Sequence, residues 1–214
     1  MKKFLLVFLR VIFVIGVMLA ATFFGLKTYF QFQSDKAIEK SLIVEKMPVI
    51  GNPDAPFTLV EFFDYRCPHC SAMSKLVDEA VNNDPNIKIL LRPVVLSDDE
   101  SLKISSFILA ADDQREGLTI ALHKEVMSLS SIPTYETVKT LAKAKGINIE
   151  QAEKDAENFK LDIIKNTSLI KEIGFYAVPS LIIGDKGFLP RNQMPGINEL
   201  RLMILDAKQR LGIK

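Results

Sequence analysis

The chain has 214 residues, enough for one full domain and an appendage, and its 48% apolar content is sufficient for a buried core. Its 27 basic and 26 acidic residues are mixed along the sequence and leave a net charge of +1. No extended basic field is available to attract nucleic acid, and no pattern recurs at the roughly 20–50-residue interval of repeat proteins. The composition therefore disfavours a nucleic-acid partner and a repeat architecture.

The chain opens with a long apolar segment. Residues 4–26 follow two lysines and carry Arg10 as their one charge. Such a segment can cross about 30 Å of hydrocarbon as a helix, and Arg10 lies close enough to its start to reach the headgroups. The basic residues favour a cytoplasmic amino terminus, so we expect residues 1–26 to form a membrane anchor. The alternative is a cleaved signal peptide, although no clean site of small residues follows Ala20 and Ala21.

Residues 27–48 are more polar and have a loosely helical spacing of apolar side chains. They predict a helical stalk or linker, either a simple spacer or a device that holds two copies together as a homodimer. With or without cleavage, the rest of the chain crosses the membrane into a compartment where disulfides persist. We expect a single-pass protein of the cytoplasmic membrane whose main domain faces the periplasm or another extracytoplasmic space.

The main domain, expected over residues 49–214, opens with a βαβ pattern. After the turn residues 51–56, Phe57–Phe63 and Ile87–Val95 predict buried strands, and the apolar spacing between them predicts a helix. From about residue 97 to 173 the pattern becomes helical throughout. Helices are expected at Leu102–Ala111, Leu118–Met127, Tyr135–Ala144 and, as one or two helices, at Ile149–Gly174.

A short hairpin and a last helix complete the domain. Ser180–Ile183 and Phe188–Leu189 predict the two strands, and residues 197–211 predict the helix. The order β, α, β, a helical block, ββ, α predicts an α/β domain with an all-helical insertion at about 97–173.

The chain has two cysteines, Cys67 and Cys70, and a disulfide between them would restrain the unfolded chain little. Cys67 lies where a strand leads into a helix, so unpaired N–H groups and the helix dipole would stabilise its thiolate. Cys70, one turn later, could resolve a mixed disulfide. Pro68 suits the first helical turn, and His69 can add a positive charge or a hydrogen bond beside the sulfur. The spacing predicts a redox-active pair.

A Cys-x-x-Cys pair can also be half of a zinc site. The chain offers only His69, His123 and carboxylates as further ligands, and His69 between the two cysteines is poorly placed to join them. A metal shared between two chains is the alternative that remains. We expect no metal and no cofactor, and we interpret His123 as a structural residue of its helix.

Glu61 is an acid in an otherwise apolar strand, which is costly unless the acid is paired or functional. One hypothesis makes it a buried proton acceptor or electrostatic tuner of the cysteine pair, with Arg92 or Lys88 as a partner. The other makes it one half of a structural buried salt bridge.

Four motifs carry a resemblance to a known family. They are Gly51-Asn52-Pro53-Asp54-Ala55-Pro56, Glu61-Phe62-Phe63-Asp64-Tyr65, Cys67-Pro68-His69-Cys70 and Ala177-Val178-Pro179-Ser180. Over about residues 49–211 the chain resembles the DsbA-like thiol–disulfide oxidoreductases, which have a thioredoxin fold with an inserted helical domain. The resemblance implies that Cys67 is the exposed nucleophile and Cys70 the resolving thiol. It also implies that Pro179 is a cis proline facing the disulfide and that Val178 helps to dock the substrate chain.

Pro68-His69 and Val178 resemble the oxidase branch of this family, so we expect an oxidase that donates its disulfide to exported proteins. A DsbB-like or VKOR-like membrane protein would reoxidise it. The alternatives are an isomerase or client-specific reductase, dimeric through the stalk, and, from another class, a non-catalytic chaperone-like or zinc-bridged assembly factor.

Overall fold

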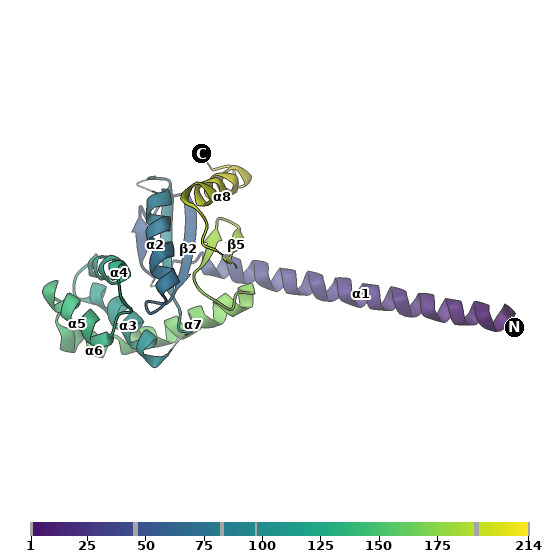
Figure 1. The fold of residues 1–214 in the computed structure, drawn as a ribbon, viewed down its shortest axis with the longest axis horizontal. Helices are drawn as coiled ribbons and strands as arrows, with labels where there is room; N and C mark the ends of the chain where they lie inside the picture. The colour runs from purple at the N-terminus through teal and green to yellow at the C-terminus, as the bar shows by residue number, and fades with distance from the viewer. Residues whose placement is uncertain (1, 45–46, 82–83, 97, 191–192, 214) are drawn as a thin grey trace. The chain divides into compact units, whose positions relative to one another are not determined.

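The computed structural model describes residues 2–44, 47–81, 84–96, 98–190 and 193–213. The chain divides into two compact units, residues 1–36 and residues 37–214. Helix α1 (Lys2–Ser41) makes up the first unit and contributes its last residues to the second (Figure 1). No break in this helix marks the end of the predicted anchor at residue 26.

Helix α1 is, among the described residues, the one helix long and apolar enough to cross a membrane. Its described span Leu9–Ser41 contains an 18-residue window with a mean hydropathy of 2.3, and none of that window is buried. A run of exposed Leu, Ile, Val and Phe side chains is costly in water and stable in hydrocarbon. The sequence predicted an apolar segment long enough to cross a membrane, and the structure shows this segment as part of one continuous helix.

The second unit is built on a five-stranded sheet in the order β1-β3-β2-β4-β5. Its strands are β1 (Val49–Gly51), β2 (Phe57–Phe63), β3 (Ile87–Pro93), β4 (Ser180–Ile183) and β5 (Lys186–Phe188). The central pair β2–β3 is parallel and is joined through α2 (Pro68–Val81), as the βαβ pattern predicts. The other pairs are antiparallel. Strand β1 was not predicted, because three residues beside a run of turn residues are too few to show a strand pattern.

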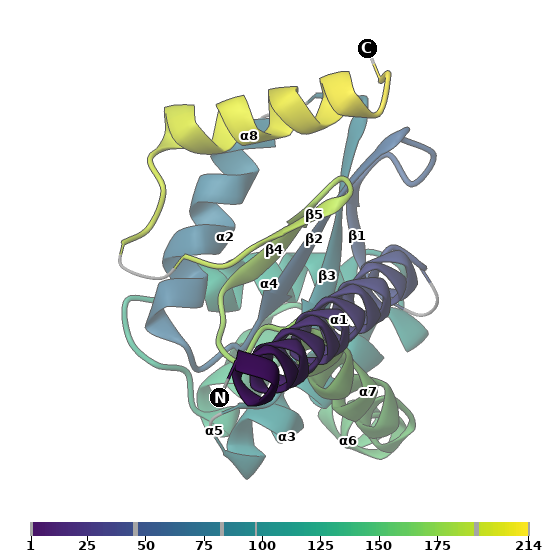
Figure 2. The ribbon, with the colours of Figure 1, turned by 90° about the vertical axis from the view of Figure 1, so that its right-hand side faces the viewer.

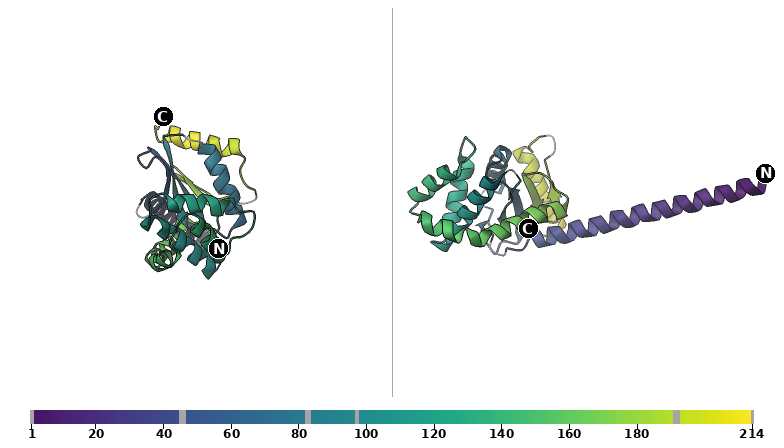
Figure 3. Two further views of the ribbon diagram at one scale, coloured as in Figure 1. Left: turned by 90° about the vertical axis from the view of Figure 1, so that its left-hand side faces the viewer. Right: turned by 90° about the horizontal axis from the view of Figure 1, so that it is seen from below.

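The helices of the predicted insertion follow β3; all but the last gather at one end of the sheet, and the last packs along one of its faces (Figure 3). They are α3 (Asp99–Leu109), α4 (Leu118–Ser128), α5 (Tyr135–Ala144), α6 (Ile149–Asp155) and α7 (Glu157–Ile173), with a 3-10 turn at Ala110–Asp113. The side chains of Asp98, Thr134 and Asn148 cap α3, α5 and α6 by accepting a backbone N–H of the first turn. The last helix, α8 (Ile197–Arg210), matches its predicted span within a residue.

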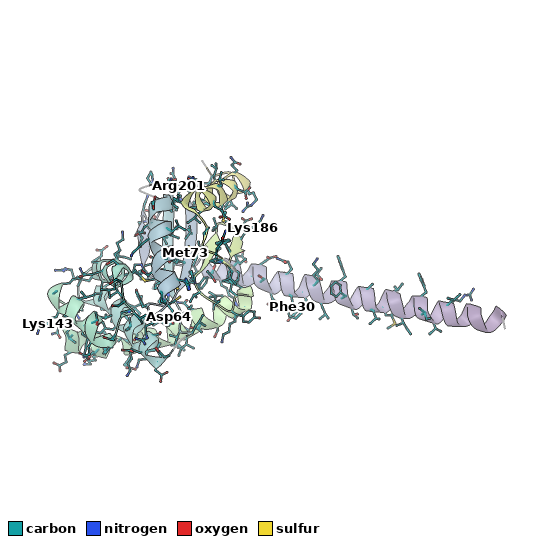
Figure 4. The ribbon with its side chains drawn as sticks, in the orientation of Figure 1. Phe30, Asp64, Met73, Lys143, Lys186 and Arg201 are labelled. Atoms are coloured by element: carbon teal, nitrogen blue, oxygen red, sulfur yellow. The ribbon has the colours of Figure 1, made fainter. Side chains whose placement is uncertain are left out.

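Each face of the sheet has its own core. On one face, Phe57, Leu59 and Phe63 of β2 pack with residues of α2, α8 and the helices α3–α6. On the other face, Val60 and Phe62 pack with α7 and with the end of α1. Figure 2 shows α2 and α8 side by side near the first face. Arg201, labelled in Figure 4, joins these two helices by donating to the backbone oxygen of Glu79.

Arg92 holds the last turn of α1 in the second unit. Its buried guanidinium donates to the backbone oxygens of Ser41 (2.8 Å), Lys40 and Ile43, and to Asn166 Oδ1 of α7 (2.8 Å). Carbonyl groups at the end of a helix have no partner within the helix, so these bonds satisfy groups that burial would otherwise leave unpaired.

Replacing Arg92 with Met should lower the free energy of unfolding of the second unit by about 3 kcal/mol, because several buried carbonyl oxygens and Asn166 lose their donor. Lys88 on the same strand, whose Nζ donates to Pro53 O at the surface, is the matched control. Lys88→Ala should cost less than about 0.5 kcal/mol. Urea unfolding of the full chain in detergent measures both, and equal losses would contradict the assignment.

Candidate functional site

The site begins at the turn between β2 and α2, which Asp64 organises. Asp64 is fully buried, and its carboxylate accepts the backbone N–H groups of Arg66 (2.9 Å) and Leu96 (3.3 Å). Its backbone oxygen accepts the N–H of Cys67 at 3.0 Å. Asp readily accepts bonds from the backbone two residues on, which bends the chain tightly. This turn places Cys67 immediately before the first residue of α2.

Cys67 and Cys70 differ sharply in their surroundings. Both are free thiols in the structure, Cys67 partly exposed and Cys70 fully buried. A hydrogen bond from the Cys70 thiol, with smaller contributions from the N–H groups of Cys70 and His69, lowers the pKa of Cys67 to about 6. Burial, and then the same bond to Cys67, raises the pKa of Cys70. One sulfur is therefore anionic at neutral pH while the other keeps its proton.

Four further residues singled out in the sequence lie near this pair. Pro68 is the first residue of α2, and both Pro68 and His69 are exposed. The Val178–Pro179 peptide bond is cis, in agreement with the family resemblance. When protonated, Cys67 Sγ donates to Val178 O at 3.8 Å, so the segment before β4 borders the reactive sulfur.

Glu61 lies beneath the pair, in the middle of β2. It is 1% exposed, and its Oε1 has no hydrogen-bond partner among the described residues. Burial, and then the charge of Asp78, raises the pKa of Glu61 to about 8. Ionised Glu61 in turn contributes to raising the pKa values of Cys70 and Tyr65. At neutral pH Glu61 is mainly a neutral acid held close to the buried thiol.

The predicted partners of Glu61 are wrong. Arg92 and Lys88 occupy alternate positions of β3, in register with Phe62 and Thr58 of β2, and side chains at these positions point to the face opposite Glu61. Arg92 binds the end of α1 there, and Lys88 Nζ binds Pro53 O. The error arose because the sequence does not give the register between neighbouring strands. Without the register, it cannot be decided to which face of the sheet a side chain of β3 points.

His123 is a structural residue, as the sequence interpretation held. It is 1% exposed, and its Nδ1 lies 3.1 Å from the hydroxyl of Tyr65, with Phe63 and Tyr65 packed edge-on against the ring. Burial, and then the charge of Lys124, lowers the pKa of His123 to about 3. The ring is therefore neutral.

Asp64 and Arg66 were missed as site residues. Arg66 forms ion pairs with Asp98 (3.1 Å) and Glu100 (2.8 Å) and donates to Pro133 O (2.8 Å). The signal for Asp64 was present in the sequence, since Asp three positions before Cys67 favours a turn. No local signal could have shown the partners of Arg66, because they lie 32 and more residues away.

No group of three or more His, Cys, Asp or Glu side chains that could hold a metal ion occurs within the described part of the chain. The arrangement is that of a dithiol at a helix start, opposite a cis proline, in a sheet flanked by helices. These features define a thioredoxin-fold protein with a helical insertion.

Comparison with known proteins agrees with this class. A family model described as thioredoxin matches residues 44–200. A solved thioredoxin-like oxidoreductase from Silicibacter pomeroyi DSS-3 is 30% identical, with a TM-score of 0.67, over 78% of this chain and 93% of that chain. A linker-deletion variant of ScsC from Proteus mirabilis shares the fold, with a TM-score of 0.73 and 21% identity over 94% of each chain.

Among curated proteins, disulfide bond formation protein D of Bacillus subtilis (strain 168) is 35% identical over 52 residues. The aligned part spans 24% of this chain and 23% of that protein. The chain belongs to the thioredoxin family, in agreement with the resemblance of its motifs to the DsbA-like thiol–disulfide oxidoreductases.

In the reduced protein, the rate of Cys67 alkylation by iodoacetamide should rise with pH around a midpoint of about 6. Cys70→Ala removes the main stabilising donor and should raise this midpoint by about one unit or more. Cys70→Ser keeps a hydroxyl donor and should shift the midpoint less. A midpoint near 9 in the unaltered protein, or identical midpoints in the two variants, would contradict the assigned hydrogen bond.

The raised pKa of Glu61 also makes stability depend on pH. The unfolded chain loses this proton near pH 4.5 and the folded chain near 8, so the contribution of neutral Glu61 declines as pH rises through this window. Glu61→Gln should therefore gain stability relative to the unaltered protein between pH 5 and 9, by on the order of 3–5 kcal/mol. Urea unfolding of each protein at pH 5 and at pH 9 measures this difference. Glu79→Gln, an exposed change on α2, is the control, and its stability relative to the unaltered protein should be the same at both pH values.

Proposed function

We propose that this chain is a membrane-anchored thiol–disulfide oxidase that donates the Cys67–Cys70 disulfide to exported proteins. The observation that carries the proposal is the separation of the two thiol pKa values, lowered to about 6 at Cys67 and raised at buried Cys70. A stabilised Cys67 thiolate favours the reduced form of the pair, which makes the disulfide form a stronger oxidant. The name of the Bacillus relative, disulfide bond formation protein D, is consistent with this direction.

The exchange has two steps. A client thiolate attacks Cys67 Sγ, the Cys67–Cys70 bond breaks, and its electron pair leaves with Cys70, which takes up a proton. The second client cysteine then attacks the client sulfur of the mixed disulfide, and Cys67 leaves as a thiolate. The client has lost two electrons and the enzyme pair has gained them.

The surrounding residues have distinct roles in this mechanism. Cys67 is the nucleophile of the reduced pair and the sulfur attacked in the oxidised pair, and Cys70 is the resolving thiol. Glu61, mainly protonated at neutral pH, supplies the proton that the departing Cys70 sulfur needs and accepts one in the reverse direction. His69 and Pro68 form the exposed first turn of α2 beside the thiolate.

The client backbone docks along Val178 and Pro179. The carbonyl of Val178 lies 3.8 Å from Cys67 Sγ, so a peptide joined to that sulfur passes directly over this segment. Pairing between the backbone of an extended client chain and the backbone of this segment would not depend on the client's sequence. This mode of docking suits an oxidase with many clients.

Turnover and location follow from the same proposal. Residues 1–26 anchor the chain in the cytoplasmic membrane and residues 27–48 lead from them to the sheet of the catalytic domain, with residues from 37 onward belonging to the same compact unit as that sheet. The catalytic domain faces the extracytoplasmic side. The partners are exported cysteine-containing proteins and a DsbB-like or VKOR-like membrane protein that returns the pair to the disulfide form. The chain could also work as a homodimer, with residues 27–48 holding two copies together.

Equilibrating the full chain in detergent with glutathione buffers, followed by thiol trapping, tests the direction of exchange. We expect a potential less negative than about −200 mV, and we expect Cys70→Ser to accumulate client mixed disulfides at Cys67. Cys67→Ser should abolish both the exchange with glutathione and the formation of client mixed disulfides. A strongly reducing potential would indicate a reductase, and efficient reshuffling of mispaired disulfides with little net oxidation would indicate an isomerase.

A further inference from the structure

A pocket of about 310 Å³ lies beside Cys67, between α2 and the loop that joins α4 to α5. We call it the α4–α5 pocket. Cys67, Pro68 and Ala72 line it from one side, and Leu129 and Ile132 line it from the other. The Val178–Pro179 segment contributes none of its lining residues, so the pocket and that segment border the sulfur from different elements.

The loop that forms the far wall is fixed to the active-site turn at both ends. Ser71, four residues after Cys67, donates from its hydroxyl to Met127 O at 2.5 Å. Arg66, directly before Cys67, donates to Pro133 O at 2.8 Å and is itself held by Asp98 and Glu100. Two bonds from the residues that flank the reactive sulfur therefore set the width of the pocket.

The lining has a definite chemistry. Apolar atoms make up the larger part of its exposed lining, and Ile132 remains 53% exposed. Among the described residues, the charged side chains that line it, Arg66 and Lys75, are both basic, and no carboxylate lines it. An apolar side chain gains by leaving water here, whereas a basic one meets the like charge of Lys75, because Arg66 is already paired with Asp98 and Glu100. The volume, at the low end of the roughly 300–1,000 Å³ of ligand pockets, suits one large side chain.

We propose that the α4–α5 pocket binds a bulky apolar side chain of the client, from a residue next to the cysteine that reacts with Cys67. The inference rests on the proposed function, in which a client polypeptide becomes joined to the Cys67 sulfur. Cys67 is itself part of the pocket wall, so a polypeptide joined to that sulfur passes the opening of the pocket. The loop between α4 and α5 is then a specificity-determining element, separate from the backbone docking at Val178.

The test compares rates at which monothiol peptides reduce the Cys67–Cys70 disulfide of the full chain in detergent. Peptides carry Phe or Gly beside their cysteine, on the amino side in one series and on the carboxyl side in another. Neither Phe nor Gly carries a charge, so the pKa and the intrinsic reactivity of the peptide thiol stay nearly the same. Acid quenching and mass spectrometry give each rate, and 2-mercaptoethanol serves as a thiol too small to use the pocket.

The Phe peptide of at least one series should react about tenfold faster than its Gly counterpart. Ile132→Ala should reduce this preference roughly threefold and leave the 2-mercaptoethanol rate unchanged. Ile164→Ala on α7 is the matched control, because Ile164 is similarly exposed, at 49% against 53%, and lies outside the pocket. It should leave every rate unchanged.

The outcomes separate this inference from the function on which it rests. Equal Phe and Gly rates in both series, with normal 2-mercaptoethanol reactivity, would overturn the pocket assignment alone. So would an Ile132→Ala effect that is the same for all thiols, because that effect would act on Cys67 chemistry. A disulfide that no thiol reduces would overturn the proposed function, and the pocket assignment with it.

Discussion

The hydrogen bond between the two active-site thiols is the interaction on which the rest of the site depends. It stabilises the Cys67 thiolate and disfavours ionisation of Cys70, so a single contact drives the two pKa values apart. It exists because the Asp64 turn places Cys67 directly before α2, which puts Cys70 one helical turn later on the buried side. Backbone N–H groups at the helix start add to the effect on Cys67.

The sheet supports this contact from below. Strand β2 delivers the turn at its end and Glu61 in its middle, and the parallel neighbour β3 keeps both in place by full pairing along its length. The same face carries the aromatic contacts of Phe63 and Tyr65 with neutral His123. Burying an acid whose Oε1 has no hydrogen-bond partner among the described residues costs stability, and Glu61 lies close enough to Cys70 to raise the pKa of that thiol when ionised.

The sequence allowed most of the architecture to be predicted, because strand, helix and turn patterns are local. Phe57–Phe63, Tyr135–Ala144 and Ser180–Ile183 have the bounds expected for them. The cysteine pair was evident from spacing and position. The predictions that failed or were missed concern contacts between residues far apart in the sequence. The face to which Arg92 points depends on strand register, and the partners of Arg66 come from α3 and from the α4–α5 loop. Such contacts leave no periodicity in the sequence.

The neutral imidazole of His123 has one more consequence. A buried histidine that first accepts a proton near pH 3 carries no charge in a mildly acidified environment, so its packing against Tyr65 and Phe63 is unaffected there. The reduced sulfur of Cys67 takes up its proton near pH 6, well before the ring does. Mild acidification would therefore protonate the Cys67 thiolate of the reduced pair, whereas the His123 ring packed against Tyr65 and Phe63 would keep its charge unchanged.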